Sequence, residues 1–451
     1  MAKEINRVPP DGGWGWVIMF SYVISNLLIV PMQQNFGLLF KNSFSRMEMT
    51  GTNVTSIIST NISLSLLICT CTGPLIKRFG IRSLAVGGAI LFTIGILTLT
   101  FATSYTNFMI SYGILTGIGE GIIRLTNSLS LNLYFLKRRR KVAGVALAIR
   151  SMGSIIFPQL IVSLLPFYGT ASSVLIIGGI CFHTVCVSLL LRPVEWYMKK
   201  APHPKRTSAT SRDVEICLLG VSEKSTNELT QGTFKRILQN IIHYYDLTLF
   251  KNPNFLSIAF GMMFSVFADV SFETLFPLVL SDLNLDNQQI ATFLSTSHIS
   301  NVLVRIFIPI IGDYFKLTSK FMYGLGCCIV ISGRFLVIYF ASTENLAIPI
   351  LWGVAHGIKT VYWVVIIADN IPPKQYPSAE SIYLVLNGTT CLLGGPLLGW
   401  IKDVTGTYVS CVYVLNAFTF VTVSLWLSEW FYSVFKKKMT SRKANECLQT
   451  E

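Results

Sequence analysis

The chain has 451 residues, of which 52% are hydrophobic and only 13% are charged, and its formal net charge is +14. Ordinary soluble domains are about one-quarter charged, so this composition excludes a soluble globular protein and indicates an integral membrane protein. A net charge this high suggests nucleic-acid binding in a soluble protein. Here the Lys and Arg residues concentrate in loops beside apolar segments, so we expect no nucleic-acid partner.

Long apolar segments recur along nearly the whole chain, and each can cross the lipid bilayer as a helix of about 20 residues. We predict twelve transmembrane helices, at 14–40, 53–76, 82–102, 106–134, 141–165, 171–192, 254–281, 287–315, 319–341, 346–371, 377–402 and 407–432. A long polar stretch separates the first six from the last six. The predicted fold class is therefore an all-α membrane protein with two six-helix bundles, at 14–192 and 254–432.

The other segments are polar: an N-terminal segment at 1–13, a linker at 193–253 and a tail at 433–451. Within the linker, apolar residues at helical spacing predict an amphipathic helix at about 233–250 that lies along the membrane surface. A partner-binding helix is the less favoured interpretation. Because Lys and Arg concentrate in this linker and in loops such as 137–141, the positive-inside rule places the linker and both termini in the cytosol.

Charged side chains inside the predicted helices are the candidates for function. Each charge at the bilayer centre costs at least about 2.5 kcal/mol, so such residues normally face a watery cavity or one another. They are Glu120, Arg124 and Arg150 in the first half and Asp269, Glu273, Arg305, Arg334, His356 and Lys359 in the second.

Three of these charges have simple structural interpretations. Glu120 and Arg124 are one helical turn apart, so we expect them to neutralise each other. Arg150 lies too deep to reach the interface, and either shares Glu120 or faces a cavity. Arg334 is nearer the outer end of its helix, and we expect its side chain to extend to the interface.

Arg305 is the strongest candidate for a substrate site. Its guanidinium is permanently charged and presents a planar fork that matches a carboxylate, so at mid-depth it can bind an anion. The alternative is an ion pair with Asp269 or Glu273 that only stabilises the bundle. His356 and Lys359, three residues apart on one helix face, could add titratable or anion-binding capacity, and a buried structural histidine is the alternative.

Motifs for other chemistry are missing from the sequence. There is no G-x-x-x-x-G-K-[ST] run for direct use of ATP and no arrangement of nucleophile and base. The cysteines lack metal-ligand spacing. We therefore expect no enzyme activity, no cofactor and no metal site, and transport would draw on ion or substrate gradients.

Two ordered segments carry a family resemblance. PPDGGWGW at 9–16 and YFLKRRRKVAGVALAIRSMG at 134–153 resemble the two signatures of the monocarboxylate transporter family, within the major facilitator superfamily. Similar segments at 246–250 and 395–399 extend the resemblance over nearly the whole chain. It implies two bundles around a central cavity that opens alternately to either side, in the plasma membrane. It also implies a single-span immunoglobulin-type glycoprotein as a candidate partner.

Within the second signature, the matching residues suggest structural roles. Lys137, Arg138 and Arg139 are expected to fix a cytosolic loop and to gate by switching salt bridges between the halves. Gly144 and Gly153 are expected to allow close packing of the fifth helix on a neighbour.

The resemblance is incomplete where the family handles protons. In its proton-coupled members, a lysine late in the first helix and an Asp-x-x-x-Arg pair in the eighth bind the proton and the carboxylate. Here the lysine position falls at Gln34, and the pair reads Asn301 and Arg305. Neither amide can take up a proton near neutral pH.

The prediction is therefore a transporter of small monocarboxylates or related organic acids without the usual proton relay. Arg305, Asn301 and Gln34 are the expected substrate-binding residues. Coupling through Asp269, Glu273, His356 or Lys359 is an open alternative. Two others are an uncoupled carrier of aromatic amino acids or other larger metabolites, and a non-transporting membrane receptor or scaffold.

Overall fold

The computed structural model describes residues 7–8, 10–135, 138–200, 249–250, 252–315, 318–341, 346–372 and 375–448. Nearly all of the linker, with the surface helix expected at about 233–250, lies outside the described residues, apart from the short stretches at its ends. Lys137 also lies outside them.

The first half of the chain is helical. It comprises α1 (Gly15–Arg46), α2 (Gly51–Phe79), α3 (Ile81–Thr98) with the 3-10 turn η1 (Leu99–Phe101), a continuous rod made of α4 (Tyr105–Phe108), the π-helix η2 (Met109–Thr116) and α5 (Gly117–Tyr134), then α6 (Arg139–Cys181), α7 (His183–Leu189) and the 3-10 turn η3 (Val194–Trp196). Two short strands, β1 (Arg7–Val8) and β2 (Lys199–Lys200), pair antiparallel and tie the two ends of this half together.

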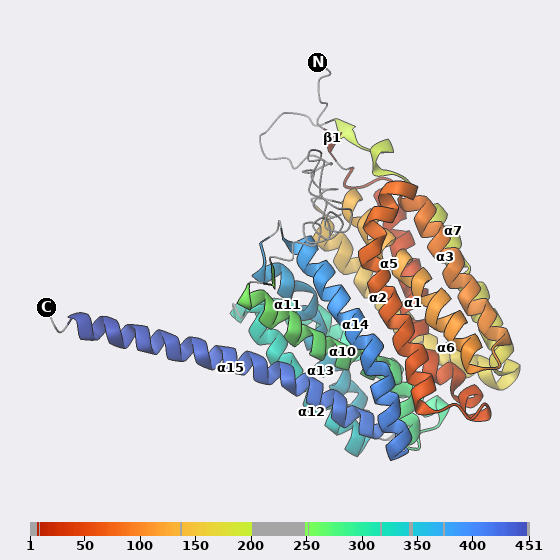
Figure 1. Ribbon diagram of the computed structural model, residues 1–451. Helices are drawn as coiled ribbons and strands as arrows, with labels where there is room; N and C mark the ends of the chain where they lie inside the picture. Colours follow the sequence, from red (N-terminus) through yellow and green to blue (C-terminus); the bar gives the residue numbers. More distant parts are fainter. Residues whose placement is uncertain are drawn as a thin grey trace, which may run out of the picture.

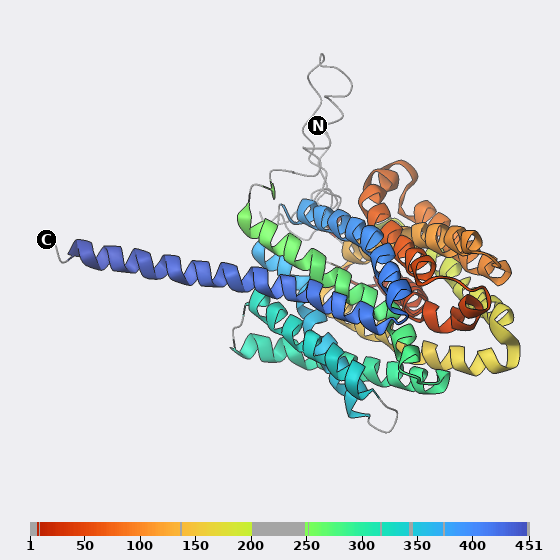
Figure 2. The ribbon, with the colours of Figure 1, turned by 60° about the horizontal axis from the view of Figure 1, so that its bottom comes forward.

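The second half contains six long helices. They are α10 (Pro253–Asp282), α11 (Asn287–Phe315), α12 (Ser319–Phe340), α13 (Ala347–Asn370), α14 (Tyr376–Thr405) and α15 (Val409–Leu448). Asn252 caps α10 through its side-chain oxygen, and Gly406 ends α14 in the left-handed conformation that glycine adopts without strain. The last part of α15 projects away from the bundles (Figures 1 and 2).

The predicted number of membrane crossings is confirmed. Among the described residues, ten helical segments are long and apolar enough to span a membrane. One of them, Ile149–Leu189, has 41 residues and is interrupted by Gly169, whose φ of 67° breaks α6. At about 1.5 Å per residue this segment is twice as long as a bilayer is thick, so it holds two crossings. α13 supplies the remaining one.

The two halves lie side by side, with α2 against α14, α1 against α10 and α6 against α11 (Figure 1). One apolar cluster contains residues of both halves, such as Phe36, Phe40, Phe276 and Leu278. It lies toward the connections 47–50 and 406–408, which we call the closed end. Toward the opposite or linker end, where α1 and α10 begin, each described apolar cluster belongs to one half only. The halves are therefore packed together mainly at the closed end.

Candidate functional site

A small cavity lies between the halves at mid-depth. It is lined by Gln34 and Asn35 of α1, Glu273 and Phe276 of α10, Leu294, Ser297, His298 and Asn301 of α11, and Trp352, Gly353 and His356 of α13. Its volume of about 20 Å³ has room for roughly one water molecule. An organic acid would therefore enter only if the halves or their side chains moved apart.

Asn301 and His356 join α11 to α13 at this cavity. The Asn301 amide nitrogen lies 2.8 Å from Nδ1 of His356. Nε2 of the same ring lies 3.4 Å from the hydroxyl of Thr360, which itself donates to the His356 carbonyl oxygen. These contacts fit a neutral imidazole that accepts at Nδ1 and carries its proton on Nε2. The predicted contact of Asn301 with Arg305 is replaced by this bond to His356.

Glu273 is the carboxylate that lines the cavity. Its Oε1 lies 3.5 Å from Nδ1 of His356, and its side chain is 25% exposed. No Lys or Arg among the described residues approaches this carboxylate within ion-pair distance. Glu273 therefore contributes a negative charge to the cavity without a contacting cation.

Gln34 lies where the first half meets the cavity. Its Oε1 accepts a hydrogen bond from the Ser154 hydroxyl of α6 at 2.7 Å, and its side chain is half-buried. The neighbouring Asn35 amide donates to the carbonyl of Pro31 at 2.9 Å. The α1 wall of the cavity thus offers hydrogen-bonding groups and no charge.

Arg305 lies one helical turn from Asn301, toward the linker end. Its side chain is half-buried, and its buried Nε has no hydrogen-bond partner among the described residues. The guanidinium interacts electrostatically with Glu273 and with Arg150 of the first half. It forms no ion pair with Asp269 or Glu273 in the described part of the chain, so the stabilising ion pair considered as an alternative is not what the structure contains.

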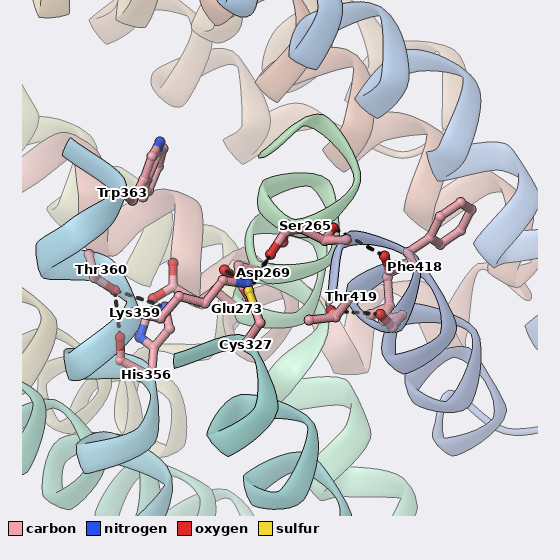
Figure 3. A network of polar contacts seen from close by, with 12 residues as sticks. Ser265, Asp269, Glu273, Cys327, His356, Lys359, Thr360, Trp363, Phe418 and Thr419 are labelled. Carbon is pink, nitrogen blue, oxygen red and sulfur yellow. Dashed lines mark hydrogen bonds and ion pairs between the residues drawn. The ribbon is translucent and has the colours of Figure 1, made fainter. Parts of the chain in front are cut away.

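Asp269 is instead part of a buried charge network. Its Oδ1 accepts from Arg334 at 2.8 Å and its Oδ2 from Lys359 at 2.6 Å, and Arg334 also donates to Thr419 at 2.9 Å. Figure 3 shows Asp269 and Lys359 meeting beside Ser265 and Cys327. Asp269, Lys359 and Arg334, which we call the buried triad, connect α10, α12, α13 and α15.

The expectation that Arg334 extends to the outer interface is wrong. The side chain is fully buried and points into the bundle. A carboxylate and a hydroxyl from neighbouring helices satisfy its guanidinium there, which removes the reason for it to reach water.

In the first half, Glu120 and Arg124 form the ion pair that their spacing predicts. Arg124 also lies 3.5 Å from the side-chain oxygen of Gln33. Arg150 hydrogen-bonds to the Tyr22 side chain and interacts electrostatically with Arg124 and Glu273. Its charge also acts on Glu120.

The residues of the second signature lie around the start of α6. Arg138 is exposed at the N-cap, Arg139 is the first residue of the helix, and Gly144 lies inside it. A Cβ at Gly153 would come within 2.5 Å of the Leu27 carbonyl oxygen, so α6 approaches the α1 backbone closely there.

Sequence reasoning missed the aromatic wall of the cavity. The Trp352 ring stacks on His356, with ring centroids 5.7 Å apart and planes 9° or less from parallel, at 8°. Trp352 also meets Phe276 edge to face. The spacing held a usable signal, because Trp352 precedes His356 by four residues and His298 precedes Asn301 by three, which puts each on the face of a predicted site residue.

Comparison with known proteins followed this geometry closely. A family model for the Major Facilitator Superfamily matches residues 15–361. Monocarboxylate transporter 13 of Bos taurus is 26% identical over 413 residues, covering 91% of this chain and 88% of its own. Monocarboxylate transporter 2 of Homo sapiens is 24% identical over 432 residues, covering 93% and 86%.

Among solved structures, a mutant of the nucleoside transporter NupG superposes with a TM-score of 0.67 at 15% identity. The match covers 92% of this chain and 99% of that chain. At this identity the likeness concerns the fold alone.

Proposed function

Because the chain belongs to the major facilitator superfamily and is a membrane transporter of its monocarboxylate transporter family, we propose that it carries small monocarboxylates or related organic acids. We place it in the plasma membrane, with both termini in the cytosol, on the basis of its basic loops and its relatives. The same resemblance motivates a search for a single-span immunoglobulin-type glycoprotein as partner.

The observation that carries this proposal is the Arg305 guanidinium. It lies beside the cavity, retains an unbonded Nε, and has no carboxylate at ion-pair distance among the described residues. A desolvated guanidinium without a contacting anion is costly inside a membrane, and a substrate carboxylate offers the bidentate partner that it lacks.

Transport by alternating access fits the packing of the halves. They share an apolar cluster at the closed end, while the linker end has separate clusters in each half. With the linker in the cytosol, this arrangement corresponds to a state closed toward the outside.

Uncoupled transport fits the hydrogen bonds of the two amides. Gln34 and Asn301 stand at the family's proton-handling positions and are bonded to Ser154 and His356. Asp269 is neutralised by two cations in the buried triad, which leaves Glu273 and His356 as the titratable groups in the cavity wall. Coupling through those two is the alternative.

The aromatic wall favours a second candidate, an uncoupled carrier of larger aromatic acids or aromatic amino acids. Trp352 and Phe276 present flat apolar surfaces to the cavity, and such surfaces bind aromatic rings. This candidate differs from the first in substrate size and not in mechanism.

The test is uptake into reconstituted vesicles of labelled lactate, pyruvate, phenylpyruvate and phenylalanine, with and without an inward pH gradient. We expect at least one carboxylate to enter at the same initial rate under both conditions. Strong acceleration by the gradient would contradict uncoupled transport. The variant Arg305→Gln should lose uptake while reaching the membrane normally, and unchanged affinity in that variant would rule out the anchor role.

A further inference from the structure

Arg150 is the one cavity-facing charge of the first half that the proposed function does not use. Its side chain is half-buried inside the membrane region of α6, and Tyr22 is its hydrogen-bond partner. Arg124, by contrast, is already neutralised by Glu120. Arg150 therefore carries a positive charge with no carboxylate in contact among the described ion pairs.

The packing of α6 on α11 sets the depth of Arg150. The Ser295 hydroxyl donates to the carbonyl oxygen of Ile155 at 2.7 Å, and these helices run in opposite directions. At about 1.5 Å per residue, Arg150 lies roughly 7.5 Å from Ile155 toward the linker end. The same rise along α11 leads from Ser295 to Ser300, next to Asn301. Arg150 is thus level with Asn301, and Arg305 lies one to two turns beyond.

The electrostatic interactions agree with this placement. Arg150 and Arg305 each act on the other's charge, and both interact with Glu273. Two guanidiniums against one carboxylate leave an excess of one positive charge across the boundary between the halves. The buried triad adds two cations and one carboxylate on the side of the second half. A monocarboxylate would compensate the excess at the boundary.

We infer that Arg150 is a second carboxylate-binding residue, so that the substrate's acid group is shared by Arg150 of α6 and Arg305 of α11. An anion held by one cation from each half links the two bundles at mid-depth. Substrate binding thereby favours closure of the linker end around the cavity. This inference rests on the proposed function and adds to it a specificity-determining residue on the first half.

The experiment measures dissociation constants of pyruvate and phenylpyruvate for the purified full chain by titration calorimetry, with pyruvamide as the uncharged control. Arg150→Gln should weaken binding of both acids at least about tenfold, as one lost charge-assisted hydrogen bond would. Arg150→Lys keeps the charge but not the fork, so its loss should be smaller. Binding of pyruvamide should not change in either variant.

Tyr22→Phe is the matched control, because it removes the hydrogen-bond partner of Arg150 and leaves the guanidinium in place. We expect Tyr22→Phe to bind both acids within about twofold of the unmodified protein, since the charge persists. If Arg150→Gln binds the acids as tightly as Tyr22→Phe while Arg305→Gln loses them, Arg150 is structural and the inference is overturned, whereas the proposed function stands.

Two further outcomes are decisive. Should Arg150→Gln fail to fold, Arg150→Lys replaces it: weaker acid binding than in Tyr22→Phe supports the inference, and equal binding overturns it. If the unmodified protein binds neither acid, the proposed function fails and the role of Arg150 fails with it.

Discussion

The Asp403 carboxylate at the end of α14 accepts the backbone N–H of Gly51 at the start of α2, with 2.5 Å between Oδ1 and N. Its Oδ2 accepts from the backbone N–H and the hydroxyl of Thr52 at 2.8 and 2.7 Å. A side chain of one half thus caps a helix of the other, where unpaired N–H groups and the helix dipole favour a negative charge. This contact lies at the closed end.

Loss of the Asp403 cap should favour opening of the closed end. A helix cap contributes about 1 kcal/mol, so Asp403→Ala should raise the population ratio of open to closed forms roughly fivefold. Spin labels on Ser45 and Gln288, both exposed at the closed end, would report this as a larger long-distance population. Lys402→Gln is the control, because Lys402 lies 3.8 Å from Asp403 on the surface and contributes little. Equal distance distributions in Asp403→Ala and the unmodified protein would contradict the prediction.

The buried triad should dominate the stability of the second half. Removing one partner of a buried ion pair leaves an uncompensated charge and costs about 3–5 kcal/mol. Asp269→Asn and Arg334→Gln should therefore both lower the temperature of unfolding strongly, as measured in detergent.

The control for the triad is Glu429→Gln. Glu429 pairs with Lys320 at 2.7 Å, but its side chain is 41% exposed, so the change should cost only about 0–1 kcal/mol. If Arg334→Gln were as stable as Glu429→Gln, the triad would not be an important stabilising contact.

Much of the fold could be predicted from the sequence because a membrane helix shows itself in its own apolar length. The role of a charge inside a helix cannot be predicted in this way, since it depends on neighbours that are distant in sequence. Arg334 illustrates the limit: its partners Asp269 and Thr419 are 65 and 85 residues away. Glu120 and Arg124 could be paired correctly because both lie on one helix, four residues apart.

The candidate site shows the same division. Arg305 and Asn301 stand out because polar groups are rare in apolar segments. Trp352 and Phe276 do not stand out there, since aromatic residues are ordinary in a membrane helix. Only the packing of α10 against α13 brings their rings together beside His356.

Close packing of α6 on α1 predicts that Gly153 tolerates no side chain. A Cβ there would lie 2.5 Å from the Leu27 carbonyl oxygen and 2.8 Å from the Pro31 ring. Gly153→Ala should therefore destabilise the protein by about 1–3 kcal/mol through overpacking, seen as a lower unfolding temperature. Gly179→Ala in the same helix is the matched control, because nothing lies within 4 Å of a Cβ at that position. The prediction fails if the two alanine variants unfold at the same temperature.

The absence of the proton-handling residues predicts that coupling can be introduced. The double variant Gln34→Lys with Asn301→Asp adds two ionisable groups at the cavity, one on each half and the second beside Arg305. An added carboxylate can be protonated together with substrate binding, so an inward pH gradient should then drive uptake. We expect pyruvate uptake to become severalfold faster with the gradient in the double variant, and to be independent of it in the unmodified protein. Each single variant is a control, because one group alone does not rebuild the pair. A double variant that binds pyruvate but ignores the gradient would show that Gln34 and Asn301 are not the positions that decide coupling.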